Sequence, residues 1–410
     1  MTESMVLPRP QSAVSQFRAF LSFFGFIGVI AGFRWFGSSD AITCFASLAV
    51  ALALPHIWQA TTGEWPAQSK PESRRQLFHR LILKMAGLAV IYGLLAAFYF
   101  AFHGYYEAFV KPLRGVIEVL WLPLLTISPI YVWLTDRLMD DPYDGLYQVG
   151  LAVSGSFSRI DRSMTLQYLL GWAVKGFFIP LMVGYALNDI RWFLSGDFLS
   201  ELERNGGYYF FAYRFIFFID VTFAAVGYLC AMRLIGTHIR STEPTTSGWV
   251  VCIICYEPFW PLFSRNFFPY EDGFYWNDWL AHSSGAWFLW CSFILTCLVV
   301  YVWGSISFGI RFSNLTNRGI LTNGPYRWLK HPHYVSKNIS WWLVSVPFMT
   351  NQPPEIAVRN CLLLLAVNGI YYLRAITEER HLSRDPAYVT YCAWMRENSI
   401  YAMLKRIGKK

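Results

Sequence analysis

The residues best suited to chemistry lie in one basic stretch, Arg311–Tyr334, which is dense in arginine, lysine, histidine, asparagine and tyrosine. Gly319 and Gly324, together with Pro325 and Pro332, each of which disfavours helix at the residue before it, predict a folded loop at the membrane surface. Backbone amides, cationic side chains and aromatic faces suit a ligand with a carboxylate, an adenine ring and ribose hydroxyls. A basic surface loop that binds anionic lipid head groups is equally consistent with this composition.

A second cluster, Arg374–Tyr391, follows the last apolar block. If the helix continues, Arg374 and Glu378 are four residues apart and lie on one face, so that one helix end presents a positive and a negative group towards the loop. A surface ion pair of little energetic value is the alternative. The position at the mouth of the last crossing favours a functional pair.

The elements that must position these residues are apolar. Hydrophobic residues make up 55% of the 410 positions and charged residues 15%, against about 45–50% and about 25% in soluble domains. The sequence therefore predicts an all-α, polytopic membrane protein with about ten crossings. The predicted apolar blocks are 19–36, 41–60, 82–102, 115–134, 167–188, 209–232, 248–263, 282–305, 338–350 and 356–373.

The distribution of Lys and Arg predicts the orientation. With the N-terminus inside, the cytoplasmic connections hold 25 of these residues and the opposite side holds seven, as the positive-inside rule requires. Both termini are predicted to be cytoplasmic. The stretch before the first block lacks the order of regions found in a cleaved signal peptide, so the first block is interpreted as an anchor.

Several classes of function are disfavoured. The basic residues are scattered between apolar blocks, so the net charge of +8 does not indicate nucleic-acid binding. The eight cysteines fall mostly inside apolar runs and indicate neither a disulfide framework nor a zinc site. His331, His333 and His381 lack the helical spacing of membrane metal enzymes, so no metal site is predicted.

Ionisable residues inside the blocks are expensive in hydrocarbon and should face the protein interior or a wet cavity. Lys175 and Asp220 are predicted to pair between neighbouring helices. Glu257-Pro258 interrupts the seventh block, which fits a kinked helix or a re-entrant segment. Buried polar clamps explain these residues, and a substrate path through a transporter is the alternative.

Several motifs occur in order within about the last hundred residues, roughly 304–400. They are Gly324-Pro325-Tyr326, Lys330-His331-Pro332-His333-Tyr334, an intervening helical hairpin, Glu378-Glu379-x-x-Leu382 and Tyr388-x-x-Tyr391. This region resembles the isoprenylcysteine carboxyl methyltransferase family and its phospholipid-methyltransferase-like relatives. We therefore divide the chain into residues 1–281, a transmembrane region of unknown role, and residues 282–410, a methyltransferase-like region.

The resemblance implies a membrane methyltransferase that uses S-adenosylmethionine, enclosed by the cytosolic loop and the last helices, on a lipophilic or lipidated substrate. It implies that Arg374 contacts the substrate. The cofactor-binding residues that it implies are Arg318, Gly319, Ile320, Leu321, Tyr326, His331, Pro332, His333, Tyr334 and Glu378.

The sequence departs from the family pattern in two places. Lys330 stands where arginine usually precedes the His-Pro pair, and Ser336-Lys337-Asn338 replaces a more apolar, glycine-containing start of the next helix. A carboxylate acceptor needs orientation by Arg374 and no base. An amine or hydroxyl acceptor would need a general base, and Glu379 and His381 are the candidates for that base.

Two other functions stay open at this point. Sterol-type reductases of the same superfamily use NADPH, but they usually carry a double tryptophan upstream and an asparagine just before the motif tyrosine, where this chain has His333. A transporter or assembly protein would use the first eight crossings, with Lys175, Asp220 and Glu257 as its main support.

Overall fold

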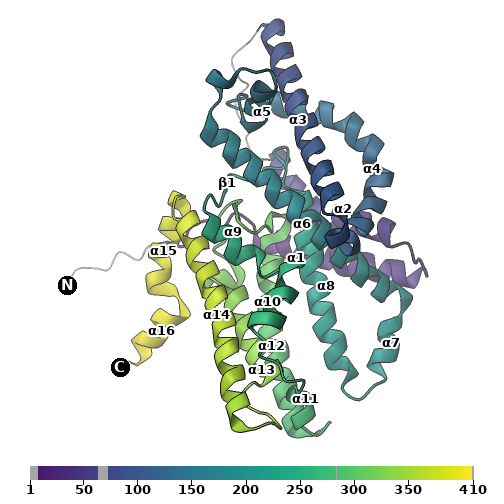
Figure 1. Ribbon diagram of the computed structural model, residues 1–410, viewed down its shortest axis with the longest axis vertical. Helices are drawn as coiled ribbons and strands as arrows, with labels where there is room; N and C mark the ends of the chain where they lie inside the picture. The colour runs from purple at the N-terminus through teal and green to yellow at the C-terminus, as the bar shows by residue number, and fades with distance from the viewer. Residues whose placement is uncertain (1–7, 63–72, 283, 409–410) are drawn as a thin grey trace, which may run out of the picture.

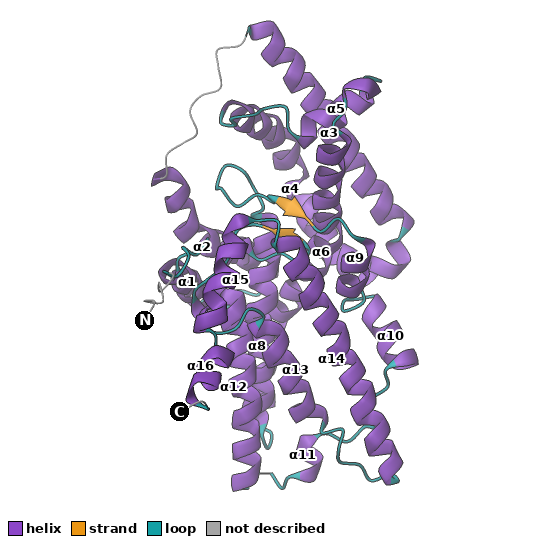
Figure 2. Ribbon diagram, turned by 90° about the vertical axis from the view of Figure 1, so that its left-hand side faces the viewer, coloured by secondary structure: helices purple, strands orange, loops and turns teal. Residues whose placement is uncertain are grey.

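Long apolar stretches fold into helices because hydrocarbon offers the backbone no hydrogen-bond partner outside its own segment. The computed structural model describes residues 8–62, 73–282 and 284–408. The molecule is elongated, and its regular secondary structure is almost all helical (Figures 1 and 2). The predicted all-α class is confirmed.

Six helices among the described residues are long and apolar enough to cross a membrane. They are α1 (Gln16–Trp35), α3 (Arg74–Ala101), α6 (Arg162–Ser195), α8 (Gly207–Leu229), α12 (Gly285–Phe308) and α14 (Pro354–Leu382). The other helices are α2 (Ala41–Thr62), α4 (His103–Arg137), α5 (Gly145–Val153), α7 (Asp197–Leu202), α9 (Thr246–Ile253), α10 (Phe259–Phe267), α11 (Trp276–Trp279), α13 (Pro332–Ser345), α15 (Pro386–Asn398) and α16 (Ile400–Ile407). Three short 3-10 helices, η1 (Phe157–Arg159), η2 (Gly309–Arg311) and η3 (Gly324–Arg327), complete the helical elements.

The predicted count of ten crossings is not confirmed by these helices. The seventh block forms two short helices, α9 and α10, that meet near Glu257-Pro258, which agrees with the interruption predicted there. The ninth block lies largely in α13, whose 14 residues extend only about 21 Å against a hydrocarbon core of about 30 Å.

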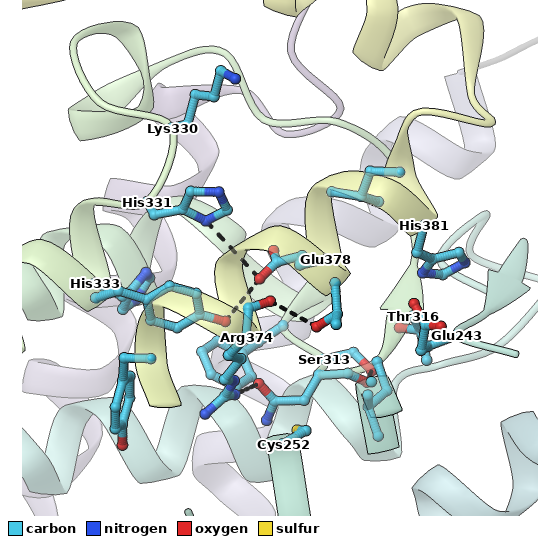
Figure 3. Close-up of a pocket in the computed structure, with 18 of the residues that line it drawn as sticks. Glu243, Cys252, Ser313, Thr316, Lys330, His331, His333, Arg374, Glu378 and His381 are labelled. Carbon is cyan, nitrogen blue, oxygen red and sulfur yellow. Dashed lines mark hydrogen bonds and ion pairs between the residues drawn. The ribbon is translucent and has the colours of Figure 1, made fainter. Parts of the chain in front are cut away.

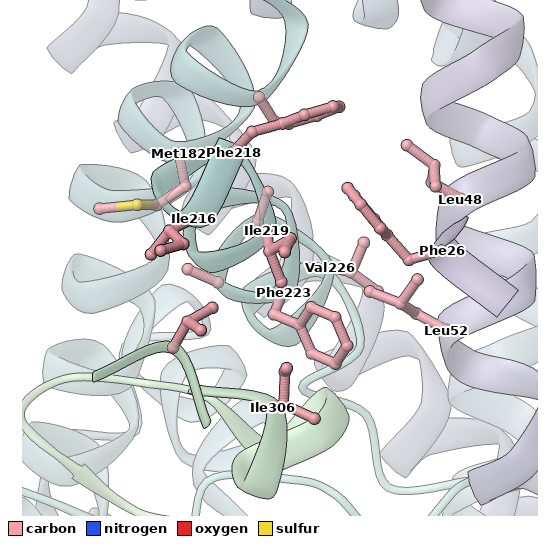
Figure 4. Packing of buried hydrophobic residues seen from close by; sticks show 14 of the residues in the cluster. Phe26, Leu48, Leu52, Met182, Ile216, Phe218, Ile219, Phe223, Val226 and Ile306 are labelled. Carbon is pink, nitrogen blue, oxygen red and sulfur yellow. The ribbon is translucent and has the colours of Figure 1, made fainter. Parts of the chain in front are cut away.

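The main hydrophobic core joins α1, α2, α6, α8 and α12. In Figure 4, Phe26 of α1 and Leu48 and Leu52 of α2 face Phe218 and Phe223 of α8. Phe26 and Phe218 pack edge to face, with ring centroids 5.1 Å apart, an arrangement that aromatic pairs prefer. This core holds α12, and with it the loop that follows α12, in a fixed position.

A group of buried charges lies at the contact of α3, α4 and the segment that enters α5. The Asp136 carboxylate is fully buried and accepts from Arg80 Nη2 at 2.7 Å and from Lys84 Nζ at 2.8 Å. Lys84 also contacts Asp144 at 3.3 Å. We call these four residues the saturated cluster, because each charge has an opposite charge within ion-pair distance.

The predicted pair between Lys175 and Asp220 is wrong. Lys175 of α6 donates to the carbonyl of Ala231 at 3.0 Å, whereas Asp220 of α8 accepts from the hydroxyls of Tyr301 and Ser305 on α12. Each residue finds its hydrogen-bond partners on a different element, as buried polar groups generally do.

A two-stranded ladder ties the middle of the chain to the basic loop. Strands β1 (Ser241–Thr242) and β2 (Thr316–Asn317) are antiparallel, and the Glu243 amide donates to Leu315 O at 2.8 Å. This pairing carries the residues just before α9 to the loop after α12 (Figure 2).

The basic loop is also covered by the beginning of the chain. Ala13 N donates to Ile320 O at 2.8 Å, and Thr322 Oγ1 donates to Pro10 O at 2.7 Å. Gly319 has φ +107°, and a Cβ there would lie 2.6 Å from the Ala13 side chain. The turn that accommodates the N-terminal segment therefore requires glycine.

Candidate active site

A cavity lies between α9, the loop after α12, the N-terminal half of α13 and the last turns of α14 (Figure 3). The empty space within it, including the solvent-open mouth, amounts to about 950 Å³. Its lining residues are Glu243, Gly248, Cys252 and Tyr256; Tyr301, Phe308, Phe312, Ser313, Asn314, Leu315 and Thr316; Tyr326, Lys330, His331, His333, Tyr334 and Lys337; and Tyr371, Arg374, Thr377, Glu378, His381 and Leu382.

The two residues paired by helical spacing both line this cavity. Arg374 Nη2 donates to Asn314 Oδ1 at 2.6 Å and to Tyr256 OH at 3.2 Å. Glu378 Oε2 accepts from Tyr334 OH at 2.7 Å and lies 4.0 Å from His331 Nδ1. The four-residue separation on α14 therefore aims both side chains at one space.

Aromatic rings surround the guanidinium of Arg374. Its Cζ lies 5.2 Å from the ring centroid of Tyr334, 5.4 Å from that of Tyr256 and 5.9 Å from that of Tyr371. Rings at these distances stabilise a cation without supplying a negative charge. Arg374 is thus held in place while its positive charge stays uncompensated by these contacts.

His333 belongs to a chain of hydrogen bonds that leads from the cavity into the core. Its Nδ1 lies 2.7 Å from Tyr326 OH and its Nε2 lies 2.9 Å from Ser305 Oγ, and Ser305 Oγ donates to Asp220. Because Ser305 uses its proton on Asp220, the consistent assignment has Nε2–H donating to Ser305 and Tyr326 O–H donating to Nδ1. Burial, reinforced by the nearby positive charges of Lys337 and Arg374, lowers the pKa of His333 to about 3, so the ring is neutral at physiological pH.

Glycine allows this histidine to lie where it does. A Cβ on Gly304 of α12 would lie 2.6 Å from Cε1 of the His333 ring. Any larger residue at that position would push the ring away from Ser305.

Glu379 does not line the cavity. Its carboxylate contacts Lys330 Nζ at 2.8 Å and His331 Nε2 at 3.0 Å, and it borders a separate surface hollow beside α15 and α16. Adjacent residues on a helix diverge by about 100°, so Glu378 and Glu379 cannot both face one space. The predicted catalytic role of Glu379 is untested, and its position suits orientation of His331 instead.

Five of the predicted cofactor residues also lie outside the cavity lining. Arg318 is buried, and its guanidinium donates to the carbonyls of Thr237, Gly227, Phe312, Cys230 and Ile310. Ile320 packs with Tyr388, Tyr391 and Met395, Leu321 joins the main core, and Pro332 begins α13. With Gly319 under the N-terminal segment, these residues shape the loop, whereas Tyr326, His331, His333, Tyr334 and Glu378 reach the cavity.

The sequence did not indicate Glu243, Cys252 and Tyr256 as site residues, and all three line the cavity. Glu243 is buried and its Oε1 accepts from the amide and hydroxyl of Thr245, at 2.9 and 2.5 Å. The one available signal was the polar run Ser241–Thr246 between apolar blocks. This run lies near residue 316 because the two segments pair as strands. They are more than 70 positions apart in the chain, so local sequence patterns do not reveal the pairing.

The arrangement can bind charges of both signs. Glu378 offers a carboxylate near the stacked rings of His331 and Tyr334, whose centroids are 5.4 Å apart at an interplanar angle of 6°. Arg374 and Lys337 offer cations on the neighbouring wall. A ligand that combines a positive centre with an aromatic ring fits the wall of Glu378, His331 and Tyr334. A second ligand with an anionic group fits the wall of Arg374 and Lys337.

Comparison with known proteins gives one match. The sequence model of the Isoprenylcysteine carboxyl methyltransferase (ICMT) family matches residues 286–384, and this confirms the resemblance identified from the motifs. The matched segment runs from α12 to the end of α14 and indicates a methyltransferase of a membrane-enzyme family. No curated protein and no solved structure matches the chain.

Proposed function

We propose that this protein, whose C-terminal region matches the ICMT family, is an integral-membrane methyltransferase that uses S-adenosylmethionine and methylates a carboxylate on a lipid or isoprenoid-type acceptor. The observation that carries the proposal is the shared cavity of Arg374 and Glu378. Both residues lie in the matched segment, and His331 and Tyr334 of the same segment complete the wall.

The chemistry of the cavity wall fits the cofactor. Within the described chain, Glu378 Oε2 accepts from Tyr334 and Oε1 has no hydrogen-bond partner, so Oε1 is available to accept from ribose hydroxyls. The stacked rings of His331 and Tyr334 offer an aromatic face to a purine or a sulfonium. We therefore assign His331, Tyr334 and Glu378 as the residues that would hold the cofactor.

Arg374 is assigned to the acceptor. In the part of the chain that the structure describes, only its Nη2 donates hydrogen bonds, so Nε and Nη1 can each donate a charge-assisted hydrogen bond to an anionic group, from separate edges of the guanidinium. An ionised carboxylate is already nucleophilic and needs no base. An amine or hydroxyl acceptor would instead use His381, which lines the cavity, in preference to Glu379.

When bound, S-adenosylmethionine supplies a methyl group on a sulfonium, and transfer forms an ester O–C bond as the S–C bond breaks, with no proton to remove. The contribution of the chain is then orientation and charge placement, which dominate displacements of this kind. Arg374 fixes the acceptor oxygen, and Glu378 with its tyrosine partner fixes the donor side.

We also propose ten crossings with both termini cytoplasmic, so that the cofactor enters from the cytosol and the acceptor from the bilayer. The charge distribution of 25 Lys and Arg against seven supports this topology. Cysteine-accessibility labelling should place sites near Arg74 and Tyr326 in the cytoplasm and a site near Asp272 on the far side. Finding Asp272 and Tyr326 on the same side contradicts the topology.

The proposed function is tested by calorimetry on detergent-purified protein with S-adenosylhomocysteine and with NADPH. We expect S-adenosylhomocysteine to bind, and we expect Glu378→Ala and His331→Ala each to weaken binding about tenfold or more. Glu397→Ala, which removes an exposed carboxylate on α15, is the matched control and should bind as the unmodified protein does. Binding of NADPH in place of S-adenosylhomocysteine would support a reductase and overturn the proposal.

A further inference from the structure

Lys337 is the feature of the cavity that the proposed function leaves unused. It lies on α13 one turn after His333 and one turn before Trp341, and these three residues share one face of the helix. His333 and Lys337 both line the cavity, and so does Arg374.

The surroundings of Lys337 are aromatic. Its Nζ lies 5.4 Å from the ring centroid of Trp341, 5.6 Å from that of Tyr301 and 5.9 Å from that of Tyr371. Among the described residues, none places a carboxylate within 4.0 Å of Lys337 Nζ, and none accepts a hydrogen bond from it. Asp220, the anionic side chain that influences it, already accepts from Tyr301 and Ser305.

An ammonium in this environment is costly without a counter-ion, because rings replace only part of the water that it loses. Burial lowers the pKa of Lys337, an effect that the charge of Asp220 partly opposes. An anionic group of a ligand would compensate the positive charge of the Lys337 ammonium. The environment of Lys337 therefore favours binding of an anionic ligand group.

The two cations on this wall, Arg374 and Lys337, can each bind one anionic group. Arg374 and Lys337 both lie 5.9 Å from the Tyr371 centroid, so their charges are no more than about twice that distance apart. The carboxylate that is methylated can satisfy Arg374 alone. We infer that the acceptor carries a second anionic group beside the methylated carboxylate, and that Lys337 binds it.

This inference rests on the proposed function and adds a substrate class to it, namely amphiphiles with two anionic groups at the polar end. Methylation removes the charge that faces Arg374 and leaves the charge that faces Lys337. The cofactor's own carboxylate is the other anion that could reach Lys337, and the test below separates the two sources.

The test compares two synthetic amphiphiles that differ by one carboxylate, dodecylthioacetate and dodecylthiosuccinate, titrated calorimetrically into the protein in the presence of S-adenosylhomocysteine. We expect the dicarboxylate to bind about tenfold or more tightly than the monocarboxylate. Lys337→Met should remove this difference, Lys337→Arg should keep most of it, and binding of S-adenosylhomocysteine should be unchanged in both variants. Lys405→Met, which removes an exposed lysine of α16, is the matched control.

Equal affinities of the two amphiphiles for the unmodified protein overturn the inference, and this comparison holds even if a variant fails to purify. Loss of S-adenosylhomocysteine binding in Lys337→Met also overturns it and assigns Lys337 to the cofactor carboxylate. Failure of the unmodified protein to bind S-adenosylhomocysteine contradicts the proposed function itself. The two failures are therefore distinguishable.

Discussion

Two regions of this molecule hold buried charges. In one region the charges are paired with opposite charges, and in the other the cations are surrounded by aromatic rings. In the saturated cluster, Asp136 accepts from both Arg80 and Lys84, and Lys84 also contacts Asp144. In the cavity, Arg374 and Lys337 are surrounded by tyrosine and tryptophan rings, and no described carboxylate lies within ion-pair distance of either.

The difference separates structural charges from functional ones. A buried pair whose charges cancel resists change and holds helices in register, whereas removal of one partner leaves a costly charge behind. A cation that is held by rings keeps its charge for a ligand. We therefore expect substitutions in the saturated cluster to change stability, and substitutions in the cavity to change binding and rate.

The strongest test of this contrast is Arg374→Ala. Because the proposed role of Arg374 is to orient the acceptor, methyl transfer to a membrane extract should fall by about two to three orders of magnitude. Arg374→Lys should also be impaired, since lysine keeps the charge but lacks the planar fork. Radiolabelled methyl incorporation measures the effect, and S-adenosylhomocysteine binding should be near normal in both variants. Collapse of cofactor binding would move Arg374 to the cofactor site.

The saturated cluster should behave differently under Asp136→Asn. This change leaves Arg80 and Lys84 buried beside a neutral amide, which should cost about 3–5 kcal/mol of stability. Chemical or thermal unfolding in detergent measures it. Glu118→Gln on the same helix is the matched control, because Glu118 forms an exposed pair with Arg114, and exposed pairs contribute little. A folded Asp136→Asn protein should still bind S-adenosylhomocysteine; weaker binding would mean that the two charged regions are coupled.

A smaller effect should appear in the pH dependence of stability. The pKa of His333 is lowered to about 3 in the folded protein, whereas an unfolded chain takes up the proton near its usual pKa of about 6.5. The unfolded state therefore binds more protons below that pH, and His333 should reduce stability as the pH falls, by about 1–2 kcal/mol between pH 7 and pH 5. His333→Gln should lose less stability than the unmodified protein over this interval. Identical losses would show that His333 takes up its proton over the same pH range in the folded and unfolded states, which contradicts a lowered pKa.

Helical spacing was sufficient to predict part of the site. Arg374 and Glu378 fall on one face because the helix continues through them, and the structure directs both to one cavity. The same reasoning gave no means of choosing between Glu378 and Glu379, since the choice depends on the rotation of α14 against the loop. In the structure the Glu379 carboxylate pairs with Lys330 and His331 outside the cavity. Glu378 is therefore the one of the two that faces the cavity.

Long-range contacts were the part that local patterns missed. Lys175 and Asp220 looked like partners because both interrupt apolar blocks, yet each binds groups on other elements. Tyr256 and Glu243 reach the cavity only because β1 pairs with β2 and α9 lies against α14. The proposed division at residues 281 and 282 stays a prediction, and the cavity takes side chains from both sides of it.

The N-terminal segment that covers the basic loop also bears on how the protein is made. Asn323 donates to Val14 O at 2.6 Å, and Thr322 to Pro10 O at 2.7 Å, across more than 300 residues of chain. At a synthesis rate of about 5–20 residues per second, Pro10 and Val14 wait at least roughly 15 s for their partners to leave the ribosome. The loop is thus completed by a segment that left the ribosome more than 300 residues earlier. An affinity tag placed directly before Pro10 should interfere with these contacts, whereas one placed after α16 should leave them undisturbed.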